Sequence, residues 1–244
     1  MSTVLIIAGS DSSGGAGLTR DVRTLTGFGM RTLCVVTAVT AQSDAHVSAV
    51  HVVPAELVRA QMTAALATAS IQAIKIGMLA TRSTVLAVAA GLPAEPPVVL
   101  DPVLASSSGG ELLDRAGREA LCSALLPRVT LLTPNIPEAA AILGSAVART
   151  PEELLRQGAA LLTLGPAAVL LKGGHASGPE ATDLLLMREA APRWLRTPRI
   201  DAVRRGSGCA LASAIAAGLA SGLDLATACE RGKEHVTLLL QQND

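Results

Sequence analysis

The sequence predicts an α/β fold with a mostly parallel central sheet and helices on both of its faces. Expected strands and helices alternate from the N-terminus to Lys172, as in a sheet built from successive crossover connections. The expected strands are short and mostly apolar, which is typical of strands covered on both faces. Half of the 244 residues are apolar, enough for one sizeable core, so we expect residues 1–244 to form a single domain.

Short runs rich in β-branched residues and bounded by Gly, Pro or Asp predict the strands. They are residues 3–8, 32–40, 73–77, 98–101, 129–133 and 168–172. Helical patterns occur at residues 18–28, 54–69, 81–90, 111–126, 137–143 and 151–164. Beyond Lys172, residues 181–187 and 192–196 are typical of a β-hairpin, and helices are expected over 207–220 and 225–240.

Charge and composition exclude several classes of protein. Lys and Arg number 20 and so do Asp and Glu, so no net positive field would attract a nucleic acid or an anionic membrane. One Phe and one Trp leave little for base stacking. The N-terminus lacks a basic segment followed by a long apolar run, and no stretch approaches the ~18 uninterrupted apolar residues of a membrane span. We therefore expect a cytoplasmic protein without a nucleic-acid or membrane partner.

Ligands of open parallel sheets bind beyond the carboxyl ends of the strands, so the loops that follow the strands are candidate sites. The loop of residues 8–17 is rich in glycine and leads into a helix whose first turn includes Asp21. Glycines let the backbone approach a ligand closely, and a helix N-terminus offers unpaired amides to an anion. The loop matches neither the G-x-x-x-x-G-K-[ST] nor the G-x-G-x-x-G fingerprint, so a tight turn without a ligand is an equal alternative.

Two carboxylates lie at or just beyond strand ends. Asp101 ends one expected strand, and Glu138 enters the helix of residues 137–143. Such a pair can hold a magnesium ion, which favours oxygen ligands and keeps several waters, so we expect contacts through water. The local sequence also allows a structural interpretation, because Asn135 suits a helix N-cap and Glu138 lies three residues later, as in a capping box.

The segment Gly206-Ser207-Gly208-Cys209 opens an Ala-rich helix. Two glycines at a helix start expose successive amides at the positive end of the helix dipole, which suits the charge that develops in phosphoryl transfer. The same field lowers the pKa of a thiol, so Cys209 is a candidate base or orienting group, with a buried inert cysteine as the equal alternative. Lys172, a flexible cation followed by two glycines at a strand end, is a candidate contact for phosphate.

Taken together and in order, these loops resemble the hydroxymethylpyrimidine/phosphomethylpyrimidine kinases of the ribokinase-like superfamily. The motifs that carry the resemblance are Ile6-Ile7-Ala8-Gly9-Ser10-Asp11, Ser12-Ser13-Gly14-Gly15-Ala16-Gly17, Asp21, Thr37-Ala38-Val39-Thr40-Ala41-Gln42, Lys75-Ile76-Gly77-Met78-Leu79, Asp101-Pro102-Val103, Thr133-Pro134-Asn135-Ile136-Pro137-Glu138, Lys172-Gly173-Gly174-His175 and Gly206-Ser207-Gly208-Cys209. They cover nearly the whole chain, and their order and spacing are specific although each motif alone is weak. The resemblance implies a three-layer ribokinase-like fold. It also implies transfer of the ATP γ-phosphoryl group to 4-amino-5-hydroxymethyl-2-methylpyrimidine, to its monophosphate, or to both.

The resemblance further assigns roles to individual residues. On the substrate side, Gln42 hydrogen-bonds the aminopyrimidine, and the other binding residues are Gly9, Ala16, Asp21, Met78 and Val103. On the nucleotide side, Lys172 and Asn135 bind ATP, while Asp101 and Glu138 organise Mg²⁺. The backbone of residues 206–209 stabilises the transferring phosphoryl group. A homodimer is also implied.

The chain departs from the family pattern around the start of the Ala-rich helix. Arg204 and Arg205 stand where the family usually has Thr-His, and Ser207 replaces a Thr. The added charge either favours a phosphorylated substrate or a nucleotide phosphate, or points into solvent. Two alternative functions stay open: a vitamin B6 kinase, whose family also resembles this chain at Cys209, and a pyrimidine-binding homologue that has lost phosphoryl transfer.

Overall fold

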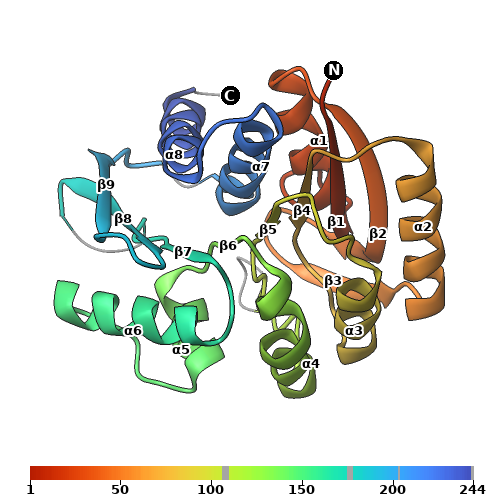
Figure 1. The fold of residues 1–244 in the computed structure, drawn as a ribbon, viewed down its shortest axis with the longest axis horizontal. Coiled ribbons are helices and arrows are strands. Elements are labelled where there is room, and N and C mark those ends of the chain that lie inside the picture. The colour runs from red at the N-terminus through yellow and green to blue at the C-terminus, as the bar shows by residue number, and fades with distance from the viewer. Residues whose placement is uncertain (106–109, 175–177, 203, 243–244) are drawn as a thin grey trace.

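The computed structural model describes residues 1–105, 110–174, 178–202 and 204–242; His175, the last residue of the Lys172 motif, lies outside them. Within these ranges one nine-stranded sheet has the strand order β3-β2-β1-β4-β5-β6-β7-β8-β9 (Figure 1). Its strands are β1 (Thr3–Asp11), β2 (Arg31–Gln42), β3 (Val47–Val52), β4 (Ala73–Ile76), β5 (Val98–Leu100), β6 (Leu131–Leu132), β7 (Ala168–Leu171), β8 (Glu180–Met187) and β9 (Arg193–Pro198). The strands from β2 to β7 in this order are parallel, and β3, β8 and β9 add antiparallel edges. The expected mostly parallel sheet and the hairpin are confirmed.

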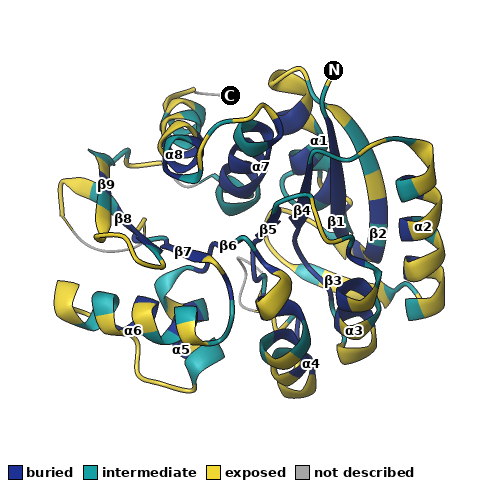
Figure 2. Cartoon of the chain, viewed as in Figure 1, coloured by how far each residue is buried: buried dark blue, intermediate teal, exposed yellow. Residues whose placement is uncertain are grey.

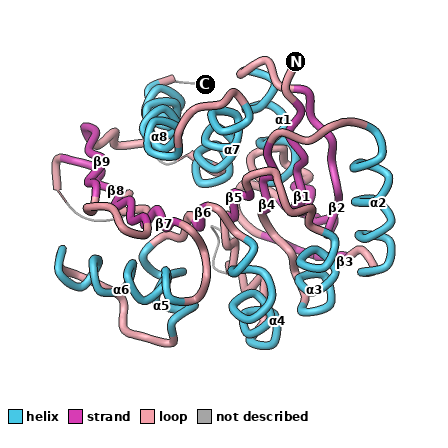
Figure 3. Tube along the Cα trace, viewed as in Figure 1, coloured by secondary structure: helices cyan, strands magenta, loops and turns pink. Residues whose placement is uncertain are grey.

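Helices cover both faces of the sheet (Figures 1 and 3). They are α1 (Gly17–Gly27), α2 (Ala55–Thr68), α3 (Arg82–Gly91), α4 (Arg115–Ala120), α5 (Ile136–Leu143), α6 (Pro151–Thr163), α7 (Ser207–Ala220) and α8 (Leu225–Gln241). One layer contains α2 to α6, and the opposite layer contains α1, α7 and α8. Among the described helices, none has both the length and the apolar character needed to cross a membrane.

The core forms two apolar clusters, one on each face of the sheet. In β1, Leu5 and Ile7 belong to the cluster under α2 to α6, while Val4 and Ile6 belong to the cluster under α1, α7 and α8. The alternation follows from the pleat of a strand, whose successive side chains point to opposite faces. Because both faces are covered, β1 is almost wholly buried (Figure 2). This sandwich fixes the strand ends, and with them the loops that carry the site.

Two elements differ from the sequence-based expectation. The edge strand β3 was not predicted, because its residues are mostly exposed and carry no buried apolar run. The helix predicted for 111–126 begins only at Arg115, where the side chain of Asp114 caps it by accepting from the amide of Gly117 at 2.8 Å. Glu111 forms a short β-bridge with Ala105 instead. After Ala120 the helix continues as a π-helical turn and then a 3₁₀ turn to Arg128.

Candidate active site

A cavity of about 820 Å³ lies among the loop after β1, the ends of β4 and β5, the start of α7, the β8–β9 hairpin and α8. Nearly all residues assigned to a site from the sequence line it. They are Gly9, Ala16, Gln42, Met78, Asp101, Val103, Asn135, Glu138, Lys172, Gly206, Ser207, Gly208 and Cys209. The fold therefore brings the substrate-side and nucleotide-side candidates into one space. Asp21 is the exception, as described below.

The start of α7 contributes backbone amides to this cavity. Gly206 is the N-cap with φ of 74°, a left-handed conformation that favours glycine, and a Cβ there would overlap the carbonyl oxygen of Gly15. The amide of Ala210 donates to the carbonyl of Gly206 at 2.9 Å. The amides of residues 207–209 precede that bond, so they have no acceptor within the helix. They lie at the positive end of the helix dipole, which is an arrangement suited to an anion.

A cation and a carboxylate adjoin Gly208. A Cβ built on Gly208 would lie 3.2 Å from Lys172 Nζ and 3.5 Å from Asp101 Oδ2. The two side chains form an ion pair with 2.6 Å between Lys172 Nζ and Asp101 Oδ1, and they are 15% and 4% exposed. Burial alone would lower the pKa of Lys172, but Asp101 and Glu138 raise it above its ordinary value. An anion at the start of α7 therefore also meets a charged ammonium group.

The capping box predicted at the start of α5 is confirmed. The amide of Asn135 donates to Glu138 Oε2 at 2.8 Å, and the amide of Glu138 donates to Asn135 Oδ1 at 2.7 Å. Burial raises the pKa of Glu138 to about 7; Lys172 opposes this increase and Asp101 adds to it. Among the described residues no group of three or more acidic, His or Cys side chains could enclose a metal ion. Asp101 and Glu138 both line the cavity, and a Mg²⁺ ion held by these two carboxylates would take its other ligands from water and phosphate.

The predicted lowering of the Cys209 pKa is wrong. Burial raises the pKa of this thiol to about 11, although Lys75 and a hydrogen bond from the amide of Gly17 favour the thiolate. The cost of desolvating a thiolate thus exceeds the benefit of the nearby cation and amide. Cys209 is protonated at neutral pH, so charge stabilisation at the start of α7 falls to the backbone amides and Lys172.

The assignment of Asp21 to substrate binding is also wrong, because Asp21 does not line the cavity. Its side chain and that of Lys75 are both 0% exposed, and they form an ion pair with 2.6 Å between Lys75 Nζ and Asp21 Oδ2. Ser213, on α7, donates to Asp21 Oδ1 at 2.9 Å. Burial alone would lower the pKa of Lys75, but Asp21 and the nearby Cys209 raise it above its ordinary value. Asp21 therefore ties α1, β4 and α7 together beneath the site.

Lys75 lines the cavity and was not assigned a role from the sequence. A signal for it was present, since this lysine lies inside the apolar run Ala73–Ile76 of a strand expected to be buried. A buried ammonium group requires a carboxylate partner, because an unpaired charge in the core is costly. The sequence does not reveal which carboxylate fills that requirement.

The substrate-side candidates form a small pocket at the end of β1. A Cβ on Gly9 would lie 2.9 Å from Met78 Sδ, so only glycine leaves Met78 in its place. Gln42 is held by its neighbours: its carbonyl accepts from Ser12 Oγ at 2.8 Å and its Oε1 accepts from Thr40 Oγ1 at 3.2 Å. Its amide NH₂ group and the apolar wall of Met78 can therefore present a fixed hydrogen-bonding edge to a flat heterocycle.

At the other end of the cavity, sequence reasoning missed a buried ion pair. Lys233 on α8 contacts Asp183 on β8 with 2.8 Å between Nζ and Oδ2, and the side chains are 8% and 7% exposed. Asp183 Oδ1 accepts from the amide of Gly173 at 2.9 Å, which holds the loop after Lys172. The two charges lie 50 residues apart in the chain, so local patterns do not pair them. This pair joins α8, the hairpin and the loop after β7.

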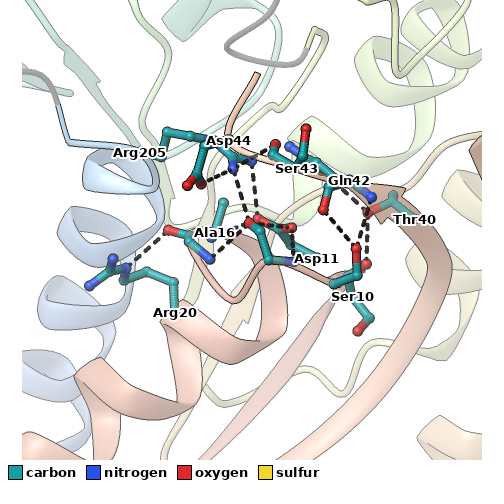
Figure 4. A network of polar contacts seen from close by, with 12 residues as sticks. Ser10, Asp11, Ala16, Arg20, Thr40, Gln42, Ser43, Asp44 and Arg205 are labelled. Atoms are coloured by element: carbon teal, nitrogen blue, oxygen red, sulfur yellow. Dashed lines mark hydrogen bonds and ion pairs between the residues drawn. The ribbon is translucent and has the colours of Figure 1, made fainter. Parts of the chain in front are cut away.

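The two arginines before α7 do not point into solvent. Arg205 forms an ion pair with Asp11 at 3.1 Å and another with Asp44 at 2.9 Å, and its side chain is only 16% exposed (Figure 4). Arg204 donates to the carbonyls of Leu239 and Gln242, at the end of α8, at 2.8 and 3.0 Å. Both side chains are therefore engaged with the protein itself.

Comparison with known proteins agrees with this geometry. The model of the family described as phosphomethylpyrimidine kinase matches residues 11–244. The hydroxymethylpyrimidine/phosphomethylpyrimidine kinase of Rhizobium meliloti (strain 1021) is 42% identical over 242 residues, which cover 98% of this chain and 91% of that protein. The crystal structure of phosphomethylpyrimidine kinase from Clostridium difficile 630 has a TM-score of 0.85 and 35% identity, covering 98% of this chain and 100% of that one.

A pyridoxal kinase is also structurally similar. The structure of the Staphylococcus aureus enzyme in complex with AMP-PCP and pyridoxal has a TM-score of 0.88 and 27% identity, covering 97% of this chain and 87% of that one. The three-layer fold, with a cavity at the start of α7, thus defines a ribokinase-like kinase of small molecules. Within that class the chain belongs to the phosphomethylpyrimidine kinase family. The resemblance seen in the sequence is confirmed.

Proposed function

We propose that this chain transfers the γ-phosphoryl group of ATP to the hydroxyl group of 4-amino-5-hydroxymethyl-2-methylpyrimidine, and then to the phosphate of the resulting monophosphate. One observation carries the proposal: the pocket with Gln42 and Met78 shares a single cavity with the amides of α7 and with Lys172. The family relation supports a pyrimidine as the acceptor. Both phosphorylations then belong to thiamine biosynthesis.

The acceptor would be held at the end of β1. The Gln42 side chain can donate to a ring nitrogen or accept from the exocyclic amine, because an amide offers both functions. Gly9, Ala16, Met78 and Val103 supply the apolar walls. Positioning the hydroxymethyl group toward α7 turns a bimolecular reaction into an effectively unimolecular one, which is the main contribution that a kinase of this kind makes.

The transferring phosphoryl group would meet fixed positive potential at the start of α7. The start of α7 and the ammonium group of Lys172 lie side by side, so an anion there would meet both the amides of residues 207–209 and the positive charge of Lys172. Because Cys209 is protonated at neutral pH, the acceptor hydroxyl would keep its proton until the new P–O bond has largely formed and the bond to ADP has broken, and would then pass it to an oxygen of the transferred phosphoryl group, as a loose transition state allows. Mg²⁺, when bound with ATP, would neutralise phosphate charge, and Asp101 and Glu138 are the residues that would hold it through water.

The direct test is a coupled assay of ADP release with three acceptors offered separately: the hydroxymethylpyrimidine, its monophosphate and pyridoxal. We expect turnover of both pyrimidines, with a much lower kcat/KM for pyridoxal. Pyrimidine binding in calorimetry without any ADP release would refute the proposal and identify a binding protein that has lost phosphoryl transfer.

A vitamin B6 kinase is the second candidate, and the structural similarity to a pyridoxal kinase with bound pyridoxal favours it. Pyridoxal and the pyrimidine are both flat heterocycles that carry a hydroxymethyl group, so one pocket can accept either of them. A kcat/KM for pyridoxal well above that for the pyrimidine would select this alternative.

The organisation of the chain remains part of the proposal. We expect a cytoplasmic homodimer with one domain per chain. The continuous nine-stranded sheet supports the single domain. Val39 and Val50, which are 50% and 41% exposed on β2 and the edge strand β3, supply apolar surface for a second copy. Light scattering coupled to size-exclusion chromatography would test the dimer, and a monomeric mass would refute it.

A further inference from the structure

Arg205 connects three segments that are distant in the sequence (Figure 4). Its Nη1 donates to Ser13 Oγ in the loop after β1, and to the carbonyl of Ser43 and Asp44 Oδ1 in the turn after β2, each at 2.9 Å. Its Nη2 donates to Asp11 Oδ2 at 3.1 Å. Arg205 itself directly precedes Gly206, the N-cap of α7. One guanidinium group thus bridges the start of α7 and both loops of the substrate pocket.

Asp11 is the strong partner in this network. Its side chain is 4% exposed, whereas that of Asp44 is 89% exposed, so the Asp44 pair is weakened by solvent. Asp11 Oδ1 also accepts from the amide and the hydroxyl of Ser13, and Oδ2 accepts from the amide of Ala16, all at 2.9 Å. The Asp11 carboxylate therefore fixes the conformation of the loop of residues 11–16, and its ion pair with Arg205 connects this loop to the start of α7.

The same loop also fixes the backbone of Gln42, the residue proposed to recognise the pyrimidine. Ser12 Oγ donates to the carbonyl of Gln42 and accepts from its amide, both at 2.8 Å. A displacement of the loop of residues 11–16 would therefore displace Gln42 as well. The contact between Gly206 and the backbone at Gly15 shows how closely the start of α7 packs on this loop.

We propose that Arg205 is a positioning residue that clasps the loop of residues 11–16 and the turn of residues 42–46 onto the start of α7, so that the pyrimidine pocket and the anion-binding amides keep a fixed spacing. The guanidinium group already serves four acceptors, two of them carboxylates that neutralise its charge. Although Arg205 also lines the cavity, these contacts engage its charge within the protein, so we assign it a structural role rather than that of a ligand of the substrate phosphate. This inference rests on the proposed pyrimidine kinase function for its kinetic test only.

The test compares R205A and R205K with the wild type and with R193A, a control that removes an arginine paired across 3.8 Å with Glu230 on the surface. We expect R205A to raise the KM for the hydroxymethylpyrimidine by on the order of tenfold, the effect of a usual coupling energy, and the KM for ATP by less than about threefold. R205K keeps the charge but not the planar fork, so its KM should fall between those of the wild type and R205A. R193A should match the wild type.

Hydrogen exchange measured by mass spectrometry provides a test that does not need catalysis. Amides of residues 11–16 and 42–46 should exchange faster in R205A than in the wild type, while those of α3 stay unchanged.

If R205A does not fold, the same measurements on R205K decide the proposal. Unchanged exchange in both segments would overturn the clasp. So would a defect confined to the monophosphate step, because that result would make Arg205 a phosphate ligand. A wild type without kinase activity would reject the proposed function, and the exchange data would still decide the clasp.

Discussion

Replacement of Asp21 by Asn is expected to destabilise the protein strongly while leaving its pyrimidine contacts in place. Asp21 and Lys75 are both completely buried, and their charged atoms lie 2.6 Å apart. The substitution keeps the size of the side chain and an acceptor for Ser213, but it leaves the ammonium group of Lys75 without its counter-charge. The change in stability therefore measures the contribution of the negative charge on Asp21.

The expected loss is about 3–5 kcal/mol of unfolding free energy, the usual cost of removing one partner of a buried ion pair. For a chain of this size that corresponds to a fall in melting temperature of roughly 6–20 °C. The pH dependence has a defined sign. With Asp21 gone, burial lowers the pKa of Lys75 below its ordinary value of 10.5, so the unfolded state binds more protons. The stability deficit should then shrink as the pH rises from about 7 toward that value.

Urea unfolding followed by circular dichroism at several pH values measures this deficit. Glu119→Gln is the matched control, because it removes a carboxylate 2.9 Å from Arg115 on the surface and should cost less than about 1 kcal/mol. The double variant Asp21→Leu with Lys75→Met replaces the pair by apolar side chains and should regain most of the lost stability.

Two results would contradict this reasoning about Asp21. The first is an unfolding free energy of Asp21→Asn within about 1 kcal/mol of the wild-type value, since a buried unpaired ammonium group should lower the stability by more than that. The second is a rise in the KM for the pyrimidine at unchanged stability, which would restore Asp21 as a substrate contact.

Three further predictions concern the start of α7 and the carboxylate of Asp101 beside it. Because the raised pKa of about 11 keeps Cys209 protonated, the wild type and C209A should show parallel profiles of kcat/KM from pH 7 to 9; a rise of about tenfold per pH unit that is lost in C209A would instead identify Cys209 as the base. Asp101→Asn should raise the Mg²⁺ concentration needed for half-maximal activity, and it should also remove the ion pair with Lys172. An unchanged Mg²⁺ titration would argue against Asp101 as a residue that holds the metal ion. Gly206→Ala should lower kcat by at least about tenfold, because its Cβ would collide with the carbonyl of Gly15, and unimpaired turnover would show that the amides of α7 are not essential.

Local patterns in the sequence were enough to predict the parallel strands and two of the helix starts at the site. Short, mostly apolar runs bounded by Gly, Pro or Asp predicted the parallel strands, because such runs are typical of strands between two covering layers. The spacing of Asn135 and Glu138 predicted the capping box, since both partners lie within one helical turn. The glycines at 206 and 208 predicted an exposed helix start. Each of these features is decided by residues that are close in the chain.

Only the tertiary structure decided which distant groups meet and how far they are desolvated. Lys75 and Asp21 are 54 residues apart, and Arg205 and Asp11 are 194 apart, so no local pattern joins them. Cys209 shows the same limit for electrostatics. Its position at a helix start suggested a lowered pKa, but desolvation of the sulfur by the surrounding protein raises the pKa instead. Burial depends on all layers of the fold at once, whereas a motif records only its own segment.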